Sequence, residues 1–282
     1  MRVLVTGAGG FTGRPLFEAL RQRGDEPHAL QADLRDSSAI IAEVAAVRPD
    51  ATIHLAARAF VASSDFDAFY AVNQIGSFHL LDALAEHVPG SPVLLASSAQ
   101  VYAADQQGLL DENAPIRPAN HYGLSKRAME MGAHFWEDRL RLIITRPFNY
   151  TGAEQESRYL IPKIVDHFVR RAPVIELGNI DVKRDFGDVR SVCGAYAALI
   201  HNADAAGVFN VSTGTLSSIR DVIAALSEMT GHRIEIVVNP AFVRQNDIPV
   251  LGGDNAKLRT TLPDWTPRPL VDTLKWMLAA RT

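Results

Sequence analysis

The sequence is poor in cysteine, in long apolar runs and in excess charge of either sign. Its one cysteine, Cys193, cannot form a disulfide within the chain. No apolar run approaches the roughly 20 residues that a membrane-spanning helix needs. The first residues lead straight into glycines, without the apolar core and cleavage site of a secretory signal peptide. We therefore expect a cytoplasmic protein with no membrane partner.

The charge balance argues against a second class of partner. The chain has 28 lysines and arginines against 32 aspartates and glutamates, a net charge of -4, without a basic block or tail that would bind a phosphate backbone. We therefore expect no nucleic-acid partner. The 282 residues, 47% of them hydrophobic, can bury a full core in one large domain or two small ones.

A glycine-rich turn follows the first predicted strand. An apolar run at 2–6 predicts a strand, and apolar residues at helical spacing predict a helix that ends near Arg23. Between them Gly7, Gly10 and Gly13 have the spacing G-x-x-G-x-x-G, whereas the stricter G-x-G-x-x-G is not met. A strand, a glycine turn and a helix in this order are typical of a pyrophosphate site at a helix N-terminus. The alternative is a glycine-rich turn that binds nothing.

The residue that would hold the adenosine ribose is ambiguous. A second strand is predicted from Glu26 to Gln31, and Asp33 lies about 20 residues beyond the glycines, where NAD-binding folds carry an acidic residue. Asp33 can equally lie at the end of a third strand, which leaves Gln31 at the tip of the second. The choice between NAD and NADP therefore stays open.

Predicted strands and helices alternate through the first half of the chain. Strand patterns cover 51–55, 92–96 and 140–145, and helical patterns cover 36–48, 66–87 and 122–139. This alternation is typical of an α/β protein with a doubly wound parallel sheet, in which ligands bind at the carboxyl ends of the strands. Ser97 and Ser98 end one predicted strand, and a long polar loop follows them. His54 lies amid apolar residues, so we interpret it as a core residue.

The second half has looser alternation. Helices are predicted at 159–171, 192–201, 219–230 and from Leu270 onward, with strands at 174–177, 208–211 and 233–238. We predict a dinucleotide-binding domain over 1–147, with returning segments near 183–212. The segments 148–182 and 213–282 would form a smaller substrate-binding lobe packed on that domain.

Tyr122 and Lys126 lie four residues apart in a predicted helix, which places both side chains on one face. Near a bound cationic cofactor ring, the ammonium would lower the phenol pKa from about 10 toward working pH. Such a phenol can pass a proton to or from a substrate oxygen. The alternative is an exposed tyrosine beside a solvated lysine on an ordinary helix. The rest of the chain favours a role of the pair in proton transfer.

Motifs spread in order along the chain resemble the extended short-chain dehydrogenases/reductases. They are Thr6–Gly13, Asp33-Leu34, His54–Ala57, Asn73, Ser97-Ser98, Tyr122–Lys126 and Arg146–Asn149. Other segments resemble most closely the branch with GDP-mannose 4,6-dehydratases and GDP-4-keto-6-deoxy-mannose reductases: Gly178–Asp181, Lys183–Phe186, Asp188–Arg190 and Arg244–Pro249. The resemblance implies a Rossmann-type fold, NAD or NADP as the cofactor, and a nucleotide-diphosphate sugar as the substrate, with GDP favoured.

The resemblance also implies roles for single residues. Tyr122 would be the acid/base, Lys126 would hold the nicotinamide ribose, Ser98 would bond to the reacting oxygen, and Asn73 would support the lysine. The implied cofactor-binding residues are Gly7, Gly10, Phe11, Thr12, Gly13, Asp33, Leu34, Ala56, Ala57, Tyr122, Lys126, Pro147 and Phe148. The implied substrate-binding residues are Ser98, Tyr122, Asn149, Arg184 and Arg244. The arginines suit a diphosphate because guanidinium binds phosphate in a bidentate fork. No metal ligand is implied.

Three positions complicate the resemblance. Arg184 is followed by Asp185, so a surface salt bridge is the alternative to a substrate contact. The family pattern Asp-Val-Arg-Asp ends here in Ser191, and the region of the third strand is short. Both departures bear on the cofactor class and the local geometry.

Three functions compete: a reductase of a nucleotide-linked 4-keto sugar, an epimerase with tightly held NAD⁺, and a non-catalytic regulator that binds a dinucleotide. The intact set of Ser98, Tyr122 and Lys126 argues against the regulator. The dehydratases that the chain resembles carry an acidic residue where Gln100 stands here, with a partner at Ala99 in some of them. We therefore expect an NAD(P)H-dependent reductase of a GDP-linked 4-keto-6-deoxy sugar, with hydride delivered to C4.

The predicted helices 66–87 and 122–139 carry more apolar side chains than one buried stripe requires, among them Phe78, Leu81, Met129 and Phe135. Together with the habit of the resembled family, this surplus predicts a homodimer formed through a four-helix contact.

Overall fold

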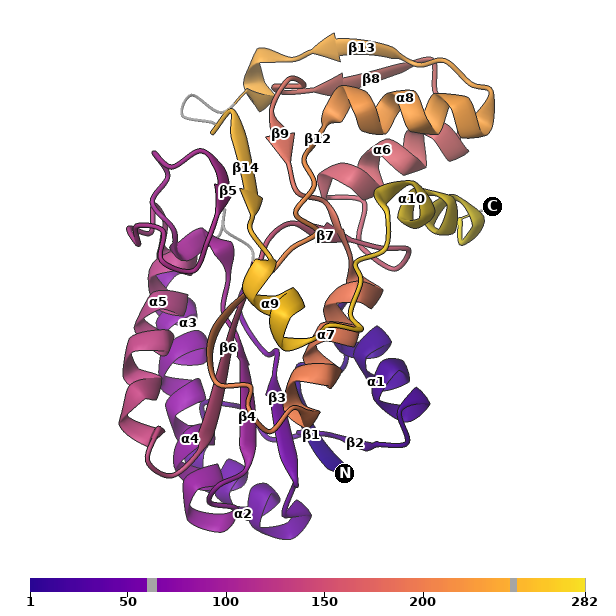
Figure 1. Cartoon of the computed structure of the whole chain (residues 1–282). Helices are drawn as coiled ribbons and strands as arrows, with labels where there is room; N and C mark the ends of the chain where they lie inside the picture. The colour runs from indigo at the N-terminus through magenta and orange to yellow at the C-terminus, as the bar shows by residue number, and fades with distance from the viewer. Residues whose placement is uncertain (60–64, 244–247, 282) are drawn as a thin grey trace.

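The computed structural model describes residues 1–59, 65–243 and 248–281. Its largest sheet has six parallel strands and lies between helices (Figure 1). Its strand order is β11-β6-β4-β3-β1-β2. The strands are β1 (Arg2–Thr6), β2 (Glu26–Ala29), β3 (Ala51–His54), β4 (Pro92–Ala96), β6 (Arg141–Pro147) and β11 (Gly207–Val211). All neighbours pair in parallel, so their carboxyl ends meet at one edge.

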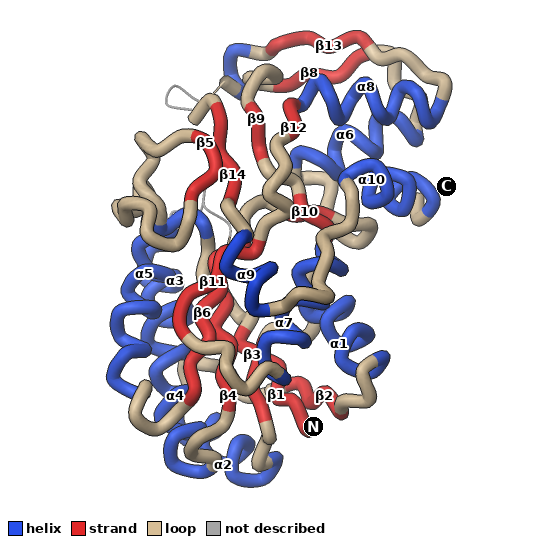
Figure 2. The backbone as a smooth tube through the Cα atoms, in the orientation of Figure 1, coloured by secondary structure: helices blue, strands red, loops and turns tan. Residues whose placement is uncertain are grey.

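Helices cover both faces of this sheet, which confirms the predicted doubly wound arrangement (Figure 2). One face packs on α1 (Gly13–Gln22) and α7 (Val189–His201), and the other packs on α2 (Ser37–Val47), α4 (Gly76–His87) and α5 (His121–Ala133). Successive side chains of a strand point to opposite faces. Val3 and Val5 therefore join the first core, whereas Leu4 joins the second.

The predicted helix 66–87 is divided into three segments. An α-helix, α3 (Phe66–Tyr70), leads into a π-helical stretch, Ala71–Ile75, which continues directly into α4. Asn73 lies in the π-helical stretch and is fully buried. Short π-helical insertions recur at functional sites because they redirect one side chain out of the helical repeat.

Helix boundaries differ from the predictions where a cap decides them. The helix α5 ends at Ala133 and is followed by a short 3₁₀ turn, His134–Trp136, whereas the prediction ran to Arg139. The helix α7 begins three residues earlier than predicted, because Asp188 accepts a hydrogen bond from the Arg190 N–H at its first turn. Polar caps of this kind define helix starts.

The surplus of apolar side chains on the two helices is smaller than predicted. Leu81 and Met129 are fully buried in the core of the single chain, and Phe78 packs against the Trp136 ring at a centroid distance of 5.5 Å. Among the four side chains named above, Phe135 alone is strongly exposed, at 77%. His54 is buried as predicted, with Nδ1 bonded to Thr6 and Nε2 bonded to Ser77.

The remaining elements form a second, smaller part of the molecule. Its core is built from α6 (Leu160–Val169), α8 (Ile219–Thr230) and α10 (Leu270–Ala279), beside the parallel pair β8 (Val174–Leu177) and β13 (Glu235–Val238). Two short strands, β7 (Tyr150–Thr151) and β10 (Gly187–Asp188), pair at the junction, and α9 (Ala256–Thr261) contacts β11.

The long loop after β4 reaches into this second part. It contains a 3₁₀ turn, Ala99–Val101, and the strand β5 (Gly108–Leu110). The strand β5 belongs to a four-stranded sheet of order β12-β9-β14-β5. It pairs with β14 (Val250–Gly253), and β14 pairs with β9 (Lys183–Arg184). The remaining strand is β12 (Ser217–Ser218). The loop therefore joins the two parts of the molecule. No helix among the described residues is both long and apolar enough to cross a membrane.

Candidate functional site

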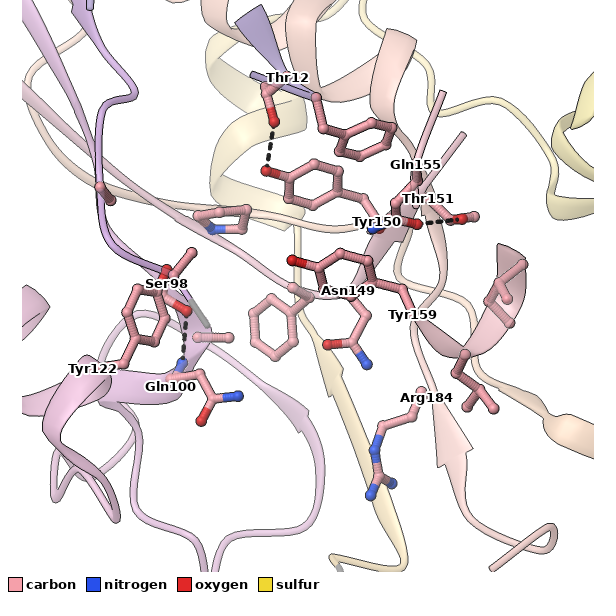
Figure 3. Close-up of a pocket in the computed structure, with 18 of the residues that line it drawn as sticks. Thr12, Ser98, Gln100, Tyr122, Asn149, Tyr150, Thr151, Gln155, Tyr159 and Arg184 are labelled. Carbon is pink, nitrogen blue, oxygen red and sulfur yellow. Dashed lines mark hydrogen bonds between the residues drawn. The ribbon is translucent and has the colours of Figure 1, made fainter. Parts of the chain in front are cut away.

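A cavity of about 1610 Å³ lies between the carboxyl edge of the large sheet and the second part of the molecule (Figure 3). The ends of β3, β4 and β6 line it through Leu55, Ala96 and Pro147, and the second part contributes Tyr159 and Arg184. A pocket for a single small ligand measures about 300–1,000 Å³. This cavity therefore has room for two ligands, one against the sheet and one against the second part.

The glycine turn forms one end of the cavity, and glycine is required there by close approach. A Cβ on Gly7, whose φ is +71°, would lie 2.8 Å from the backbone nitrogen of Ala56. A Cβ on Gly13 would lie 2.4 Å from the carbonyl oxygens of Gly7 and Ala8. The turn leads into the N-terminus of α1, whose first backbone N–H groups have no partner within the helix. Its shape and its dipole fit a pyrophosphate.

An adjoining pocket continues from this turn past the end of β2. It is lined by Asp33, Leu34, Ala56 and Ala57, which the resemblance implies as cofactor-binding residues, and Arg35 joins them. Gln31 does not line it; its side chain donates to the carbonyl oxygen of Ala29.

No pattern in the sequence indicates the pairing of Asp33 with Arg35. The Arg35 Nη2 lies 2.5 Å from the Asp33 carboxylate, and these hydrogen bonds hold the pKa of Asp33 well below its usual range. The pair therefore presents a carboxylate and a guanidinium together at this end of the cavity.

Ser98 and Tyr122 meet on the wall formed by the large sheet. Ser98 lies two residues beyond the end of β4, and Tyr122 lies in the first turn of α5. The helix approaches the Ser98 segment so closely that a Cβ on Gly123 would lie 2.3 Å from the Gln100 carbonyl oxygen. Burial raises the pKa of Tyr122, and a hydrogen bond with Ser98 acts in the opposite direction. In this protein environment the phenol therefore keeps its proton, and the lowering expected from Lys126 is not among the effects on it.

Lys126 is buried beneath these two residues, at 1% exposure, and its Nζ donates to the Ala96 carbonyl oxygen at 2.6 Å. Burial lowers its pKa to about 8, and the charge of Glu130 acts against that lowering.

Asn73 reaches α5 by way of Ser125. Its Nδ2 donates to the Ser125 Oγ and to the Arg58 carbonyl oxygen, each at 3.0 Å, and its Oδ1 accepts from the Arg58 N–H. Asn73 therefore ties α5, at the residue before Lys126, to the loop after β3.

Two further predicted substrate residues lie on the wall opposite Ser98 and Tyr122. Asn149 and Arg184 both line the cavity, beside Pro147 and Phe148, and Figure 3 shows the two side chains on the same side of it. The carboxylate of Asp185 accepts hydrogen bonds from the backbone N–H groups of Thr213 and Gly214. Arg244 lies outside the described residues.

A buried ion pair lies behind the wall that carries Ser98 and Tyr122. The Arg146 guanidinium bonds in a fork to the Glu130 carboxylate, at 2.9 and 2.8 Å, and both side chains are 2% exposed. The Ser97 hydroxyl donates to Glu130 as well. Arg146 was predicted only as part of a motif, and Glu130 was missed, because a single glutamate in a helix carries no sign of its partner 16 residues away.

Tyr150 and Tyr159 were also missed. The Tyr150 hydroxyl bonds to the Thr12 hydroxyl at 2.8 Å, and its ring stacks on Phe11 at 5.9 Å between centroids. The second part of the molecule thus contacts the glycine turn directly. Tyr159 comes just before α6, and its ring faces the cavity (Figure 3).

A doubly wound sheet with a glycine turn at a helix N-terminus defines a dinucleotide-binding protein of the oxidoreductase type. A family model described as the NAD dependent epimerase/dehydratase family matches residues 3–212. The chain belongs to this family of extended short-chain dehydrogenases/reductases, which confirms the predicted resemblance. It is an NAD(P)-dependent enzyme.

Relatives cover nearly the whole chain. GDP-6-deoxy-D-talose 4-dehydrogenase of Aggregatibacter actinomycetemcomitans is 35% identical over 268 residues, 93% of this chain and 91% of that protein. GDP-6-deoxy-D-mannose reductase of Pseudomonas aeruginosa is 32% identical over 282 residues, 94% of this chain and 92% of that protein. The solved structure of RMD from Pseudomonas aeruginosa complexed with NADPH has a TM-score of 0.89 and 29% identity, and covers 99% of this chain and 98% of that one.

Proposed function

We propose that this enzyme reduces the ketone of a nucleotide-linked 4-keto-6-deoxy sugar, with a GDP-linked sugar favoured. The observation that carries the proposal is the meeting of Ser98 with a protonated, half-buried Tyr122 in one cavity that also contains the glycine turn. NAD(P)H, when bound, supplies the hydride to C4. The two relatives named above act, by their names, on GDP-linked deoxysugars.

Each residue of the catalytic wall then has a chemical task. Reduction of a ketone needs one proton on the oxygen, and Tyr122 donates it, because burial keeps its phenol protonated until the reaction. Ser98 donates a hydrogen bond to the same oxygen and polarises the carbonyl. Lys126 lines the same cavity, where its Nζ donates to the Ala96 carbonyl oxygen, and it holds the nicotinamide ribose.

The carboxylates near the cavity support reduction over dehydration. Dehydration across C5 and C6 needs a base for the C5 proton and an acid for the C6 hydroxyl. Gln100 and Ala99 cannot serve. Glu112 accepts from the Asn210 N–H, and Asp111 accepts from the Asn113 N–H, so neither is poised to replace them. Within the described range, the carboxylates that line the cavity are Asp65, which caps α3, and Glu154 and Glu156, which pair with arginines.

An epimerase is the second candidate, because the matched family description includes epimerases. An epimerase holds NAD⁺ tightly and regenerates it in each turnover, whereas a reductase consumes NAD(P)H. Mixing the purified enzyme with NADPH or NADH and GDP-4-keto-6-deoxy-mannose distinguishes them. We expect one equivalent of oxidised cofactor for each sugar reduced. An equilibrated pair of sugars with no net cofactor oxidation would instead establish the epimerase.

Substrate binding is assigned to the second part of the molecule. Asn149 and Arg184 would contact the nucleoside diphosphate from the wall opposite Tyr122. Comparison of GDP, UDP, dTDP and CDP as competitive ligands tests the base preference, with GDP expected to bind most tightly.

The proposal includes a homodimer. Leu124 and Met131 of α5 and Phe135 of the 3₁₀ turn that follows it are 46%, 61% and 77% exposed, and these positions recur at helical spacing. Phe66 and Ile75, on the helix packed beside α5, are 49% and 45% exposed. Apolar side chains gathered in this way are typical of a surface that a second subunit covers.

A further inference from the structure

Three phenols converge on one region of the cavity. Tyr122, Tyr150 and Tyr159 all line it. Burial raises the pKa of Tyr122, the bond to Ser98 lowers it, and the nearness of Tyr159 raises it further. Two of the three hydroxyls are engaged, Tyr122 with Ser98 and Tyr150 with Thr12. The Tyr159 hydroxyl has no hydrogen-bond partner among the described residues.

The position of Tyr159 is fixed by the start of a helix. Its carbonyl oxygen accepts from the Lys163 N–H at 2.9 Å, and its own N–H donates to the Glu156 carbonyl oxygen at 3.1 Å. The helix α6 that it precedes is anchored in the second core by Ile161 and Ile164. Figure 3 shows the hydroxyl pointing from this wall toward the side of the cavity with Ser98 and Tyr122.

The chemistry of the group limits what it recognises. A phenol is neutral near pH 7 and can both donate and accept one hydrogen bond, which suits a sugar hydroxyl rather than a phosphate. In a 4-keto-6-deoxy hexose, C5 carries the ring oxygen and a methyl group. The hydroxyl on C3 is therefore the one hydroxyl adjacent to the reacting carbon.

We propose that Tyr159 is a specificity-determining residue that hydrogen-bonds the C3 hydroxyl of the sugar and so fixes which face of the C4 ketone is reduced. This inference rests on the proposed function. Tyr122 and Ser98 hold the ketone oxygen from one wall, and Tyr159 holds the neighbouring hydroxyl from the other. Two contacts on adjacent carbons prevent the ring from turning over, and this sets the configuration at C4.

The Tyr159→Phe variant removes the hydroxyl and leaves the ring. Loss of one neutral hydrogen bond corresponds to about a 3- to 10-fold fall in kcat/KM. We also expect the single C4 epimer made by the wild type to become a mixture, measured by NMR of the released sugar. The Tyr70→Phe variant is the matched control, because Tyr70 bonds to His121 and does not line the cavity. It should keep one epimer and the wild-type kcat/KM.

A second measurement needs no variant. A GDP-linked 4-keto-3,6-dideoxy sugar lacks the C3 hydroxyl, so the wild type should process it with the lower kcat/KM and the mixed stereochemistry of Tyr159→Phe acting on the full substrate. Tyr159→Phe should treat both sugars alike. If the wild type reduces the 4-keto sugar and Tyr159→Phe matches it in rate and stereochemistry, the inference fails alone. If the wild type reduces no 4-keto sugar, the proposed function fails and the inference fails with it.

Discussion

Glu130 lies one helical turn beyond Lys126 on α5, and both charged residues are buried, at 5% and 1% exposure of the whole residue. The Glu130 carboxylate is bonded at the same time to Arg146 and to Ser97. One carboxylate therefore balances two buried cations directly beneath the proposed catalytic wall.

Replacement of Glu130 by glutamine should destabilise the protein by about 3–5 kcal/mol, because it leaves the Arg146 guanidinium buried without its counter-charge. Urea unfolding followed by tryptophan fluorescence measures the change. Glu137→Gln is the control, since Glu137 pairs with His134 at the surface and should change stability by less than about 1 kcal/mol. Equal effects of the two substitutions would show that loss of the buried pair costs no more stability than loss of a surface pair.

Replacement of Lys126 by methionine should abolish turnover and stabilise the fold. Burial lowers the pKa of Lys126 to about 8 in the folded protein, from 10.5 in an unfolded chain. Below pH 8 both states hold the proton, so the full cost of burying the cation is present. Between pH 8 and 10.5 this cost fades, because the folded state releases its proton first.

We therefore expect Lys126→Met to raise the free energy of unfolding by about 1–3 kcal/mol at pH 7, and this increase to shrink as the pH approaches 10. Urea unfolding at pH 7 and pH 9.5 measures it. Lys275→Met, at an exposed position of α10, should stay within about 0.5 kcal/mol of the wild type at both values. A stability loss at pH 7 in Lys126→Met would contradict the assigned cost of burial.

The Tyr122→Phe variant should bind NAD(P)H and GDP nearly as the wild type does, while turnover falls by roughly 100-fold or more, as removal of a general acid does. Calorimetric titration of both ligands, beside steady-state kinetics, separates binding from chemistry. Turnover within a few fold of the wild type would assign the proton to another residue.

The enzyme should not dehydrate GDP-mannose. Incubation with GDP-mannose and oxidised cofactor should leave the sugar unchanged, because Gln100 and Ala99 cannot move protons at C5 and C6. Mass spectrometry detects the loss of water that dehydration would cause. Accumulation of the 4-keto-6-deoxy product would refute the assignment.

The exposed apolar face formed by α5 and the 3₁₀ turn after it should hold two chains together. We expect a dimer at micromolar concentration by light scattering, and a monomer for Phe135→Asp, which places a charge at the most exposed aromatic position of that face. Val238→Asp is the control, because Val238 is a 49% exposed apolar residue on the distant strand β13. A monomeric wild type would end this proposal.

Features that the sequence reveals depend on short-range spacing. The glycines at positions 7, 10 and 13 lie three residues apart, and Tyr122 lies four residues before Lys126. In both cases a short spacing in the sequence predicts the placement. The parallel sheet follows from alternation of strands and helices in the same way, and the family match confirms it.

Features that the sequence hides depend on contacts between distant segments. Tyr150 meets Thr12 across 138 residues, and Arg146 meets Glu130 from a different element. The π-helical turn that buries Asn73 has no period of its own to detect. Such contacts are set by the packing of whole elements, which overrides local preference.

The pairing of β5 with β14, and the place of β11 beside β6, determine how this enzyme can evolve. A chain cut after residue 147 would leave β6 as a bare edge and β5 without its neighbour. The two parts therefore cannot be exchanged as modules between relatives. New substrate ranges in this lineage should arise by single replacements along the shared wall, and a recombination library that swaps the halves should yield few folded proteins.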